Sequence, residues 1–582
     1  MSATALLIDG LIIVFYFVGI LSIGLYMGRR ENSLHDFALG GRNVPWWAVM
    51  ASIIAAETSA ATFLGAPGEG YDKKSLAYVQ LTLGLIIGRI IVGYAFLKPY
   101  YVYKVYTVYD FLGIRFGPLT KNYVSFLFLV MRTLAMGARL FVPSLVIVLA
   151  WRLFVQHQDV NFSGNAVQSL KAYAFAIIAL TVITCIYTAL GGIKAVIWTD
   201  VIQAGLMFGS ALVAIVTLLY HIGGDSPNIL NGFRALVQEV PDMVKPSGYF
   251  MTGFENKFVQ PWMEKHHLPA MGAWDYVKLI LANDYTLFSA LIGATLGNMA
   301  AFGTDQDMVQ RMLTAETYQK SRRSLITAAV MDVPIAAAFT FIGILLFVYY
   351  KQDPTFKPAA NSDVFGAYIL NGLPVGIRGL VLAGVFATAM GSLSAALNAL
   401  ATSATNDWYI PYFAKHRKES HHVAAARVFT AVFALLMIGV AVAFAFAKLS
   451  KPDIRIIPVV LGIAGFILGP MLGVFLSGMF TKRRGSDFGN MIAVTVGLAT
   501  TIVLGGLHVD MANLVSSALG SDVTYKIPDW LPKISFSWFA MIGGLVVCFI
   551  SVLFATPEHV VRDAHEKALN TDVDDDRPVS LR

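Results

Sequence analysis

Residues 55–70 read AAETSAATFLGAPGEG, and they interrupt an apolar segment that extends from 45 to 70. A segment of that length would cross a membrane as one helix, but Glu57, Thr58 and Ser59 stand inside it, and Gly and Pro residues follow them. Backbone groups freed by a break find no water in the bilayer, so a broken span is tolerated only where protein buries it or a wet cavity adjoins it. The segment therefore predicts a broken membrane helix beside a polar site.

The composition of the whole chain also indicates a membrane protein. Of its 582 residues, 57% are apolar and 14% are charged, whereas soluble domains carry about 25% charged residues. Cys185 and Cys548 stand far apart in apolar segments and predict neither a metal site nor a disulfide framework. The net charge of +7 comes from short basic clusters between apolar segments, which is typical of membrane topology rather than of nucleic-acid binding. We therefore predict a protein that is embedded in a lipid bilayer and binds no nucleic acid.

Thirteen segments have the length and apolar character of a spanning helix. They are 8–28, 45–70, 77–98, 122–152, 170–189, 195–221, 280–308, 324–350, 364–405, 423–447, 456–480, 488–508 and 535–555. The first has no basic residue before it and ends at Arg29 and Arg30, and the loops on that side of the membrane carry more Lys and Arg. Because such loops stay in the cytoplasm, we expect an all-α protein of the plasma (inner) membrane with its N-terminus outside and its C-terminus inside.

The seventh of these spans contains a second interruption. Gly293, Gly297 and Asn298 stand in it, and Gly303-Thr304-Asp305-Gln306 follow near its end. Two broken helices five spans apart run in opposite directions, which is the pattern of an inverted-repeat secondary transporter. Gly and Pro are also common in ordinary membrane helices, but here the polar residues cluster at the breaks themselves.

The ninth span carries a third polar cluster. Its members are Thr388, Gly391, Ser392, Ser394 and Asn398. Hydroxyl groups in a membrane helix often bond only to their own helix. Opposite a broken helix they would instead join freed carbonyl oxygens around a hard cation, without adding a fixed charge. This combination predicts that Na+ is the bound ion.

Charged residues within spans are costly and mark pathways or ion pairs. They are Glu57, Arg89, Arg132, Arg139, Asp200, Asp305 and Asp332. Two interpretations stay open. Arg89 forms a structural ion pair with Glu57, and Arg139 snorkels to an interface or pairs with an acid; or one of the two arginines clamps a substrate carboxylate with its planar fork. Asp305 and Asp332 stand toward the cytoplasmic ends of their spans, where we expect gate or structural roles.

Three stretches resemble the hallmarks of the sodium/solute symporter family. They are YTALGGIKAVIWTDVIQ at 187–203, Thr304-Asp305-Gln306 followed by Val309-Gln310-Arg311, and the run from Gly469 to Arg483. The resemblance extends from residue 8 to about 485 and implies a leucine-transporter-type fold: an extra N-terminal helix, ten core helices in two inverted repeats, and two peripheral helices. The implied division is 1–43 for the extra helix and loop, 44–221 and 280–485 for the repeats, 222–279 for an outer cap, 486–555 for the peripheral helices and 556–582 for a cytoplasmic tail.

The resemblance also implies the ion-binding residues. It places the sodium site on Ala55 and Thr58 of the second span and on Thr388, Gly391 and Ser392 of the ninth. Relatives usually carry a hydroxyl residue where this chain has Gly391, so Ser394, Ser59 or water would have to replace a lost ligand. Asp200 matches an acidic position near the cytoplasmic exit that in some relatives takes part in ion passage or in a second sodium site, and Asp305 is expected beside this exit.

The solute is implied to lie between the broken helices. The candidate substrate-binding residues combine positions implied by the resemblance with charges inside the spans: Glu57, Ser59, Thr62, Gln80, Thr82, Arg89, Arg139, Asn298 and Phe302. Family members that carry sugars have an aromatic gate where this chain has Ala301 and a Gln where it has Thr62, and the run from Gly469 to Phe480 is similar to the branch that carries monocarboxylates, vitamins and anions. We therefore expect sodium-coupled symport of a small organic anion.

Other function classes fit the sequence less well. An enzyme is not expected, because the chain has no H-E-x-x-H, G-x-S-x-G, P-loop or paired-Cys motif. A channel would need a continuous pore rather than broken helices. A sodium-coupled sugar or amino-acid symporter, or a transporter-like sensor without net transport, remains an alternative, and no obligate protein partner is evident.

Overall fold

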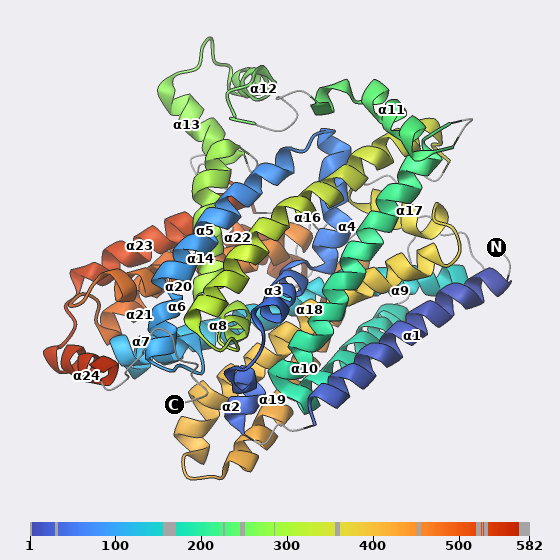
Figure 1. Ribbon diagram of the computed structural model, residues 1–582. Coiled ribbons are helices and arrows are strands. Elements are labelled where there is room, and N and C mark those ends of the chain that lie inside the picture. Colours follow the sequence, from blue (N-terminus) through green and yellow to red (C-terminus); the bar gives the residue numbers. More distant parts are fainter. Residues whose placement is uncertain are drawn as a thin grey trace.

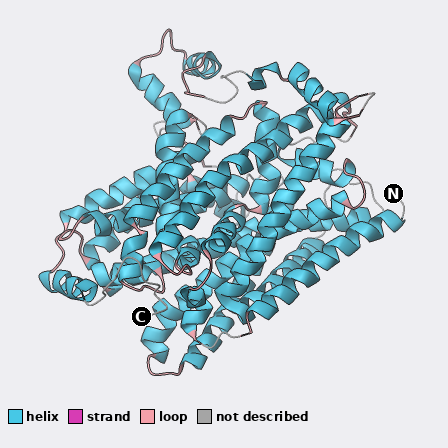
Figure 2. Cartoon of the chain, viewed as in Figure 1, coloured by secondary structure: helices cyan, strands magenta, loops and turns pink. Residues whose placement is uncertain are grey.

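The chain folds into one bundle of helices. The computed structural model describes residues 3–29, 33–154, 170–224, 227–244, 251–283, 286–355, 361–450, 456–518, 525–526, 528 and 534–569. Figures 1 and 2 show long helices that lie side by side, with a group of shorter helices at one end. Within the described residues the extended backbone forms only isolated bridges, such as that between Val44 and Ala315. The predicted all-α class is therefore confirmed.

The first half of the chain forms helices α1 to α10. Their bounds are α1 (Ala3–Met27), α2 (Leu34–Leu39), α3 (Trp46–Glu57), α4 (Ala60–Lys73), α5 (Leu81–Ala95), α6 (Leu97–Val102), α7 (Val108–Arg115), α8 (Pro118–Arg139), α9 (Phe141–Phe154) and α10 (Leu170–His221). A short 3-10 helix, η2 (Ala77–Gln80), precedes α5.

The second half forms helices α11 to α24 and two π-helical segments, η5 and η7. Their bounds are α11 (Ile229–Glu239), α12 (Asn256–His266), α13 (Ala273–Ala282), η5 (Ser289–Ala294), α14 (Thr295–Thr304), α15 (Gln306–Met312), α16 (Tyr318–Gln352), α17 (Val364–Asn371), α18 (Ile377–Ser403), η7 (Ala404–Ala414), α19 (Glu419–Ser450), α20 (Ile456–Phe480), α21 (Asp487–Leu504), α22 (Leu507–Ala518), α23 (Phe539–Leu553) and α24 (Glu558–Leu569).

The count of thirteen spans is not confirmed. Within the described residues nine helices are long and apolar enough to cross a membrane, or ten if the bent pair α3–α4 is one span. Three features account for the difference. The 52-residue α10 counts as one helix but is kinked at Gly192, between the spans predicted at 170–189 and 195–221, the span predicted at 280–308 is divided between η5 and the ten-residue α14, and the described apolar part of α20 is only Ala464–Phe480.

The first predicted break is present between α3 and α4. Helix α3 ends at Glu57, because Thr58 has φ −77° and ψ 94° and Ser59 is extended. The Ser59 side chain accepts a hydrogen bond from the backbone N–H of Thr62 at 3.3 Å, and such an N-cap stabilises the start of a new helix. The chain bends by 65° at this point.

The second break lies between α14 and α15 and is built in the same way. Asp305 has φ −85° and ψ 119°, and its carboxylate accepts a hydrogen bond from the backbone N–H of Asp307 at 3.0 Å. A polar side chain at each break therefore ends one helix and caps the next, which is why both spans are broken at these residues.

Helix α18 lies at the centre of the bundle. In its most apolar stretch, 94% of the residues are buried inside the protein, whereas in the most apolar stretch of α1 only 22% are buried. It packs against α10, α1, α3 and α8. Helix α10 in turn follows two directions, because Gly192 has φ 51° and ψ −154°, and a Cβ there would lie 2.7 Å from the Phe37 carbonyl oxygen. Figure 1 shows α11, α12 and α13 grouped beyond one end of the long helices, where the sequence predicts a cap. Residues 570–582 of the predicted tail lie outside the described residues.

Candidate functional site

The first break faces the polar stretch of α18. The Ser392 hydroxyl donates a hydrogen bond to the Ala56 carbonyl oxygen at 3.0 Å. Thr388 and Ser394 bond within their own helix, to the carbonyls of Val385 at 2.8 Å and Gly391 at 3.1 Å. The structure thus brings α18 to the broken backbone at Ser392, while the hydroxyls of Thr388 and Ser394 have local partners.

Gly391 leaves a gap that three oxygen atoms surround. A Cβ at this residue would lie 2.9 Å from Gln203 Oε1, 3.3 Å from the Ala55 carbonyl oxygen and 3.5 Å from Asp200 Oδ1. The oxygens come from α10 and α3, and each is of a type that only accepts, so their negative charge or partial charge converges on one point. Hard monovalent and divalent cations prefer such oxygen-only surroundings. These residues therefore fit a sodium ion.

A small cavity of about 10 Å³, enough for one water-sized group, adjoins Ser392. It is lined by Ser59, Ala60, Met136, Arg139, Leu140, Pro143, Ala389 and Ser392. It thus adjoins the break of the first span, the end of α8 and the middle of α18. Ser59 and Arg139 are the two predicted substrate-binding residues that line it.

Arg139 is the predicted substrate-binding arginine that lines the cavity. It ends α8 and is partly exposed, and its Nε, like those of Arg89 and Arg132, has no hydrogen-bond partner within the described residues. Two charged groups act on it: Arg132 repels it and Asp305 attracts it. An anion in the cavity would therefore share Arg139 with Asp305.

Arg89 is occupied by protein carboxylates. Its Nη2 forms ion pairs with Glu57 and, at 2.8 Å, with Asp332 on α16. The guanidinium also lies over the ring of Phe302, with 3.9 Å between its central carbon and the ring centroid. The side chain is fully buried. Of the two interpretations that the sequence leaves open, the geometry therefore favours the structural ion pair for Arg89 and Glu57.

The remaining candidate residues do not line the cavity. The Gln80 amide exchanges hydrogen bonds with the backbone of Met251, at 3.1 and 3.3 Å, which ties η2 to the segment between η3 (Pro241–Val244) and α12. Thr82 donates to the Val79 carbonyl at 2.7 Å, and Asn298 donates to the Ala294 carbonyl at 3.0 Å. Thr62 lies within hydrogen-bond distance of Ser59.

Asp200 and Asp305 belong to a buried network of charges that joins both broken helices. Arg311 on α15 contacts Asp200 at 3.3 Å, Asp307 at 2.7 Å and the hydroxyl of Ser52 on α3 at 2.9 Å. Arg132 on α8 pairs with Asp305 at 3.1 Å and with Asp307. Three carboxylates therefore share two guanidinium groups, which leaves one negative charge in excess unless Arg139 or a cation balances it.

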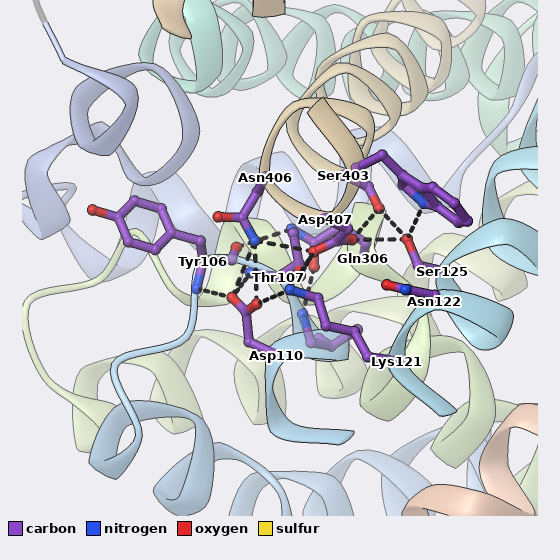
Figure 3. Close-up of polar contacts among 12 residues, drawn as sticks. Tyr106, Thr107, Asp110, Lys121, Asn122, Ser125, Gln306, Ser403, Asn406 and Asp407 are labelled. Carbon is purple, nitrogen blue, oxygen red and sulfur yellow. Dashed lines mark hydrogen bonds and ion pairs between the residues drawn. The ribbon is translucent and has the colours of Figure 1, made fainter. Parts of the chain in front are cut away.

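A second polar cluster supports this network from the end of the bundle that carries α7. Asp407 of η7 accepts hydrogen bonds from the hydroxyls of Thr107, Ser125 and Ser403 at 2.6–2.8 Å. Figure 3 shows Asp407 among these side chains, with Lys121 and Asp110 close by. Gln306, the residue after the second break, accepts a hydrogen bond from the backbone N–H of Val108 at 2.9 Å. The cluster thus connects α7, α8 and η7 to the second broken helix.

Sequence reasoning missed Gln203, Asp307 and Arg311 as site residues. Gln203 and Arg311 stand inside the motifs that carry the family resemblance, so a signal was present. Neither residue type nor spacing indicates, however, that these side chains meet Asp200 across two helices.

Broken helices around an ion-binding centre define a secondary transporter, and the comparisons with known proteins identify which kind. The chain matches the sodium:solute symporter family over residues 37–497. Because this match covers most of the chain, the protein belongs to the sodium:solute symporter family. It is a membrane transporter rather than an enzyme, and it couples the movement of a small organic solute to that of Na+.

Individual relatives cover almost the whole chain at low identity. The sodium/sialic acid symporter SiaT of Proteus mirabilis (strain HI4320) is 25% identical, over 95% of this chain and 97% of its own length. The sodium/glucose cotransporter of Vibrio parahaemolyticus is 26% identical, over 85% of each chain. The structure of a Na+-coupled sialic acid symporter in a substrate-bound outward-open state has a TM-score of 0.71 at 24% identity, over 94% of this chain and 97% of that one. The fold is therefore shared with that symporter.

Proposed function

We propose that the solute is a small organic anion whose carboxylate binds Arg139. The observation that carries this proposal is the position of Arg139 in the cavity between Ser59 and Ser392, where its planar donor group matches a carboxylate. Names of relatives do not decide the matter, because sialic acid, multivitamin and glucose carriers match the chain at similar identity. Arg89 is assigned a structural role, since Glu57 and Asp332 already neutralise it.

The sodium site assigned here lies where the first break meets α18. Its ligands are the backbone oxygens of Ala55, Thr58 and Thr388 and the hydroxyl of Ser392. Support comes from the hydrogen bond between Ser392 and the Ala56 carbonyl and from the 3.3 Å approach of the Ala55 oxygen to the Gly391 gap. A cation there would join α3 to α18. Because Ser59 follows directly after the break and lines the cavity, ion binding would also shape the solute site.

The membrane orientation and the repeats are part of the same proposal. The N-terminus and the end with α11 to α13 face outside, and the C-terminus is cytoplasmic. The repeats are residues 44–221 and 280–485, which place one broken helix at the start of each. The network of Arg132, Asp305, Asp307 and Arg311 then lies between the cavity and the cytoplasm, and its ion pairs must separate before solute and sodium leave on that side.

Energetics make the ion stoichiometry measurable. A tenfold sodium gradient provides about 1.4 kcal/mol, and a potential of about 100 mV adds about 2.3 kcal/mol per charge, which together support roughly 500-fold accumulation of a neutral solute with one sodium ion. A monoanion that moves with one sodium ion is electroneutral and gains nothing from the potential. Potential-driven uptake of a monocarboxylate therefore requires at least two sodium ions.

The test is uptake and counterflow in proteoliposomes with purified protein. We expect an inward sodium gradient, but not a potassium gradient, to drive uptake of a carboxylate and not of its neutral amide. Preferred uptake of a sugar or of an amide would refute the anion assignment. Binding of a labelled solute with no exchange across the membrane would instead identify a sensor.

A further inference from the structure

The gap at Gly391 contains two side-chain oxygens without a hydrogen-bond partner. Within the described residues neither Asp200 Oδ1 nor Gln203 Oε1 has a hydrogen-bond partner, although both atoms are buried. Both side chains are at least 99% buried. A buried polar group without a partner costs about 1–3 kcal/mol, and more when it is charged. Two such oxygens directed at one point therefore indicate a cation that both of them coordinate.

Neighbouring residues orient the Gln203 amide toward the gap. The Tyr16 hydroxyl of α1 donates to the sulfur of Met390 at 3.6 Å. Its oxygen can therefore accept a hydrogen bond, which it receives from Gln203 Nε2 at 3.3 Å. Because the nitrogen is held by Tyr16, the oxygen of the same amide points away from it, to within 2.9 Å of the position of a Cβ on Gly391.

The second oxygen of Asp200 is engaged elsewhere. Asp200 Oδ2 accepts a hydrogen bond from Ser52 at 2.5 Å and contacts Arg311 at 3.3 Å. Arg311 is shared with Asp307, which also pairs with Arg132. Asp200 therefore shares the charge of Arg311 with Asp307, and its Oδ1 faces the gap without a hydrogen-bond partner among the described residues.

We propose that Gln203 Oε1 is a ligand of the sodium ion, in place of the hydroxyl that is absent at Gly391 and beside Asp200, which the family resemblance already associates with sodium. Glycine is then a requirement of this coordination, because a side chain at residue 391 would occupy the space in which the amide oxygen and the ion meet. The inference rests on the proposed position of the ion between α3 and α18, and it adds Gln203 as a ligand. The buried hydroxyl of Tyr187, which faces Gln203 and Ser394, belongs to the same polar surroundings.

The test is equilibrium binding of radioactive sodium to the purified full-length protein in detergent, which needs no knowledge of the solute. Gln203→Ala should raise the sodium Kd at least about tenfold, since contacts to a charged group are worth about 1.5–3 kcal/mol. Gly391→Ser alone should also weaken binding, because its Cβ would meet Gln203 Oε1 at 2.9 Å. The double variant Gln203→Ala/Gly391→Ser should return the Kd to within about threefold of the wild type, because the serine hydroxyl then has both space and a vacant coordination position.

Gln310→Ala is the matched control. Gln310 is 1% exposed, and its Oε1 also lacks a partner among the described residues, but its amide nitrogen bonds to Ala38, Asn398 and Thr402 rather than lying at the gap. We expect its sodium Kd to stay within about twofold of the wild type. Melting temperatures measured in a potassium buffer show whether each variant folds. If Gln203→Ala unfolds, Gln203→Met replaces it, because methionine keeps the size of the side chain but lacks the amide.

The outcomes separate this inference from the assignment of the solute. Wild-type sodium affinity in both Gln203→Ala and Gln203→Met, or a double variant that binds no better than its weaker parent, would overturn the role of Gln203. A wild-type protein that binds sodium as expected but transports no carboxylate would refute the proposed anion and leave the ion site intact.

Discussion

Replacing Arg139 by Gln tests the solute assignment with the fewest side effects on the fold. The substitution removes the cation that faces the cavity while keeping a polar side chain of similar length. Truncating one partner of a buried, hydrogen-bonded charge pair costs about 2–5 kcal/mol, which is roughly a 30-fold to several-thousand-fold rise in the KM of a carboxylate solute. Because Arg139 acts on Asp305 without forming one of the close ion pairs described above, the melting temperature should change less than in Arg89→Gln.

The assay is sodium-driven uptake in proteoliposomes, with a panel of organic acids and the neutral amide of each transported acid. The wild type should prefer the acid, and Arg139→Gln should lose that preference while its apparent affinity for the amide stays the same. Arg139→Lys keeps the charge but loses the planar fork, so its KM should fall between those of the wild type and Arg139→Gln. An unchanged preference for the acid in Arg139→Gln would show that the carboxylate binds elsewhere.

Three further variants probe the surroundings of the cavity. Arg89→Gln leaves Glu57 and Asp332 without their shared counter-charge, so it should destabilise the protein by about 3–5 kcal/mol; a melting temperature equal to that of the wild type would contradict the structural role. Ser392→Ala removes the hydroxyl that bonds to the broken backbone, so the sodium concentration for half-maximal uptake should rise about fivefold or more; an unchanged sodium dependence would move the ion away from α18. Asp407→Ala leaves three buried hydroxyls without their acceptor and should cost about 3 kcal/mol or more in unfolding free energy, measured by thermal denaturation, whereas a shift of only a degree or two would show that water replaces the carboxylate.

The breaks could be predicted from sequence because their causes are local. Glu57, Thr58 and Ser59 interrupt an apolar segment within three consecutive positions, and Ser59 and Asp305 are residue types that cap helices. The count of spans depends on a kink. Gly192 has a non-helical backbone inside α10, at the place where hydropathy separates two spans, so the two segments are the two arms of one kinked helix.

The roles of the two arginines could not be separated by sequence. Arg89 and Arg139 both stand in apolar helices, and composition and spacing treat them alike. Only packing shows that Glu57 and Asp332 enclose the first, while the second faces the cavity beside Ser59. The identity of a functional charge in a membrane protein depends on which counter-charge reaches it, and that distance is set by the assembly of several helices.

Sequence by itself thus determined that this chain is a helical membrane carrier with two broken spans, because hydropathy, helix breakers and caps act over a few neighbouring residues. The tertiary structure decided which oxygens converge on the gap at Gly391. Gln203 and Gly391 stand far apart in the chain, and a Cβ on Gly391 would lie 2.9 Å from Gln203 Oε1 because α10 packs against α18, which no local pattern records.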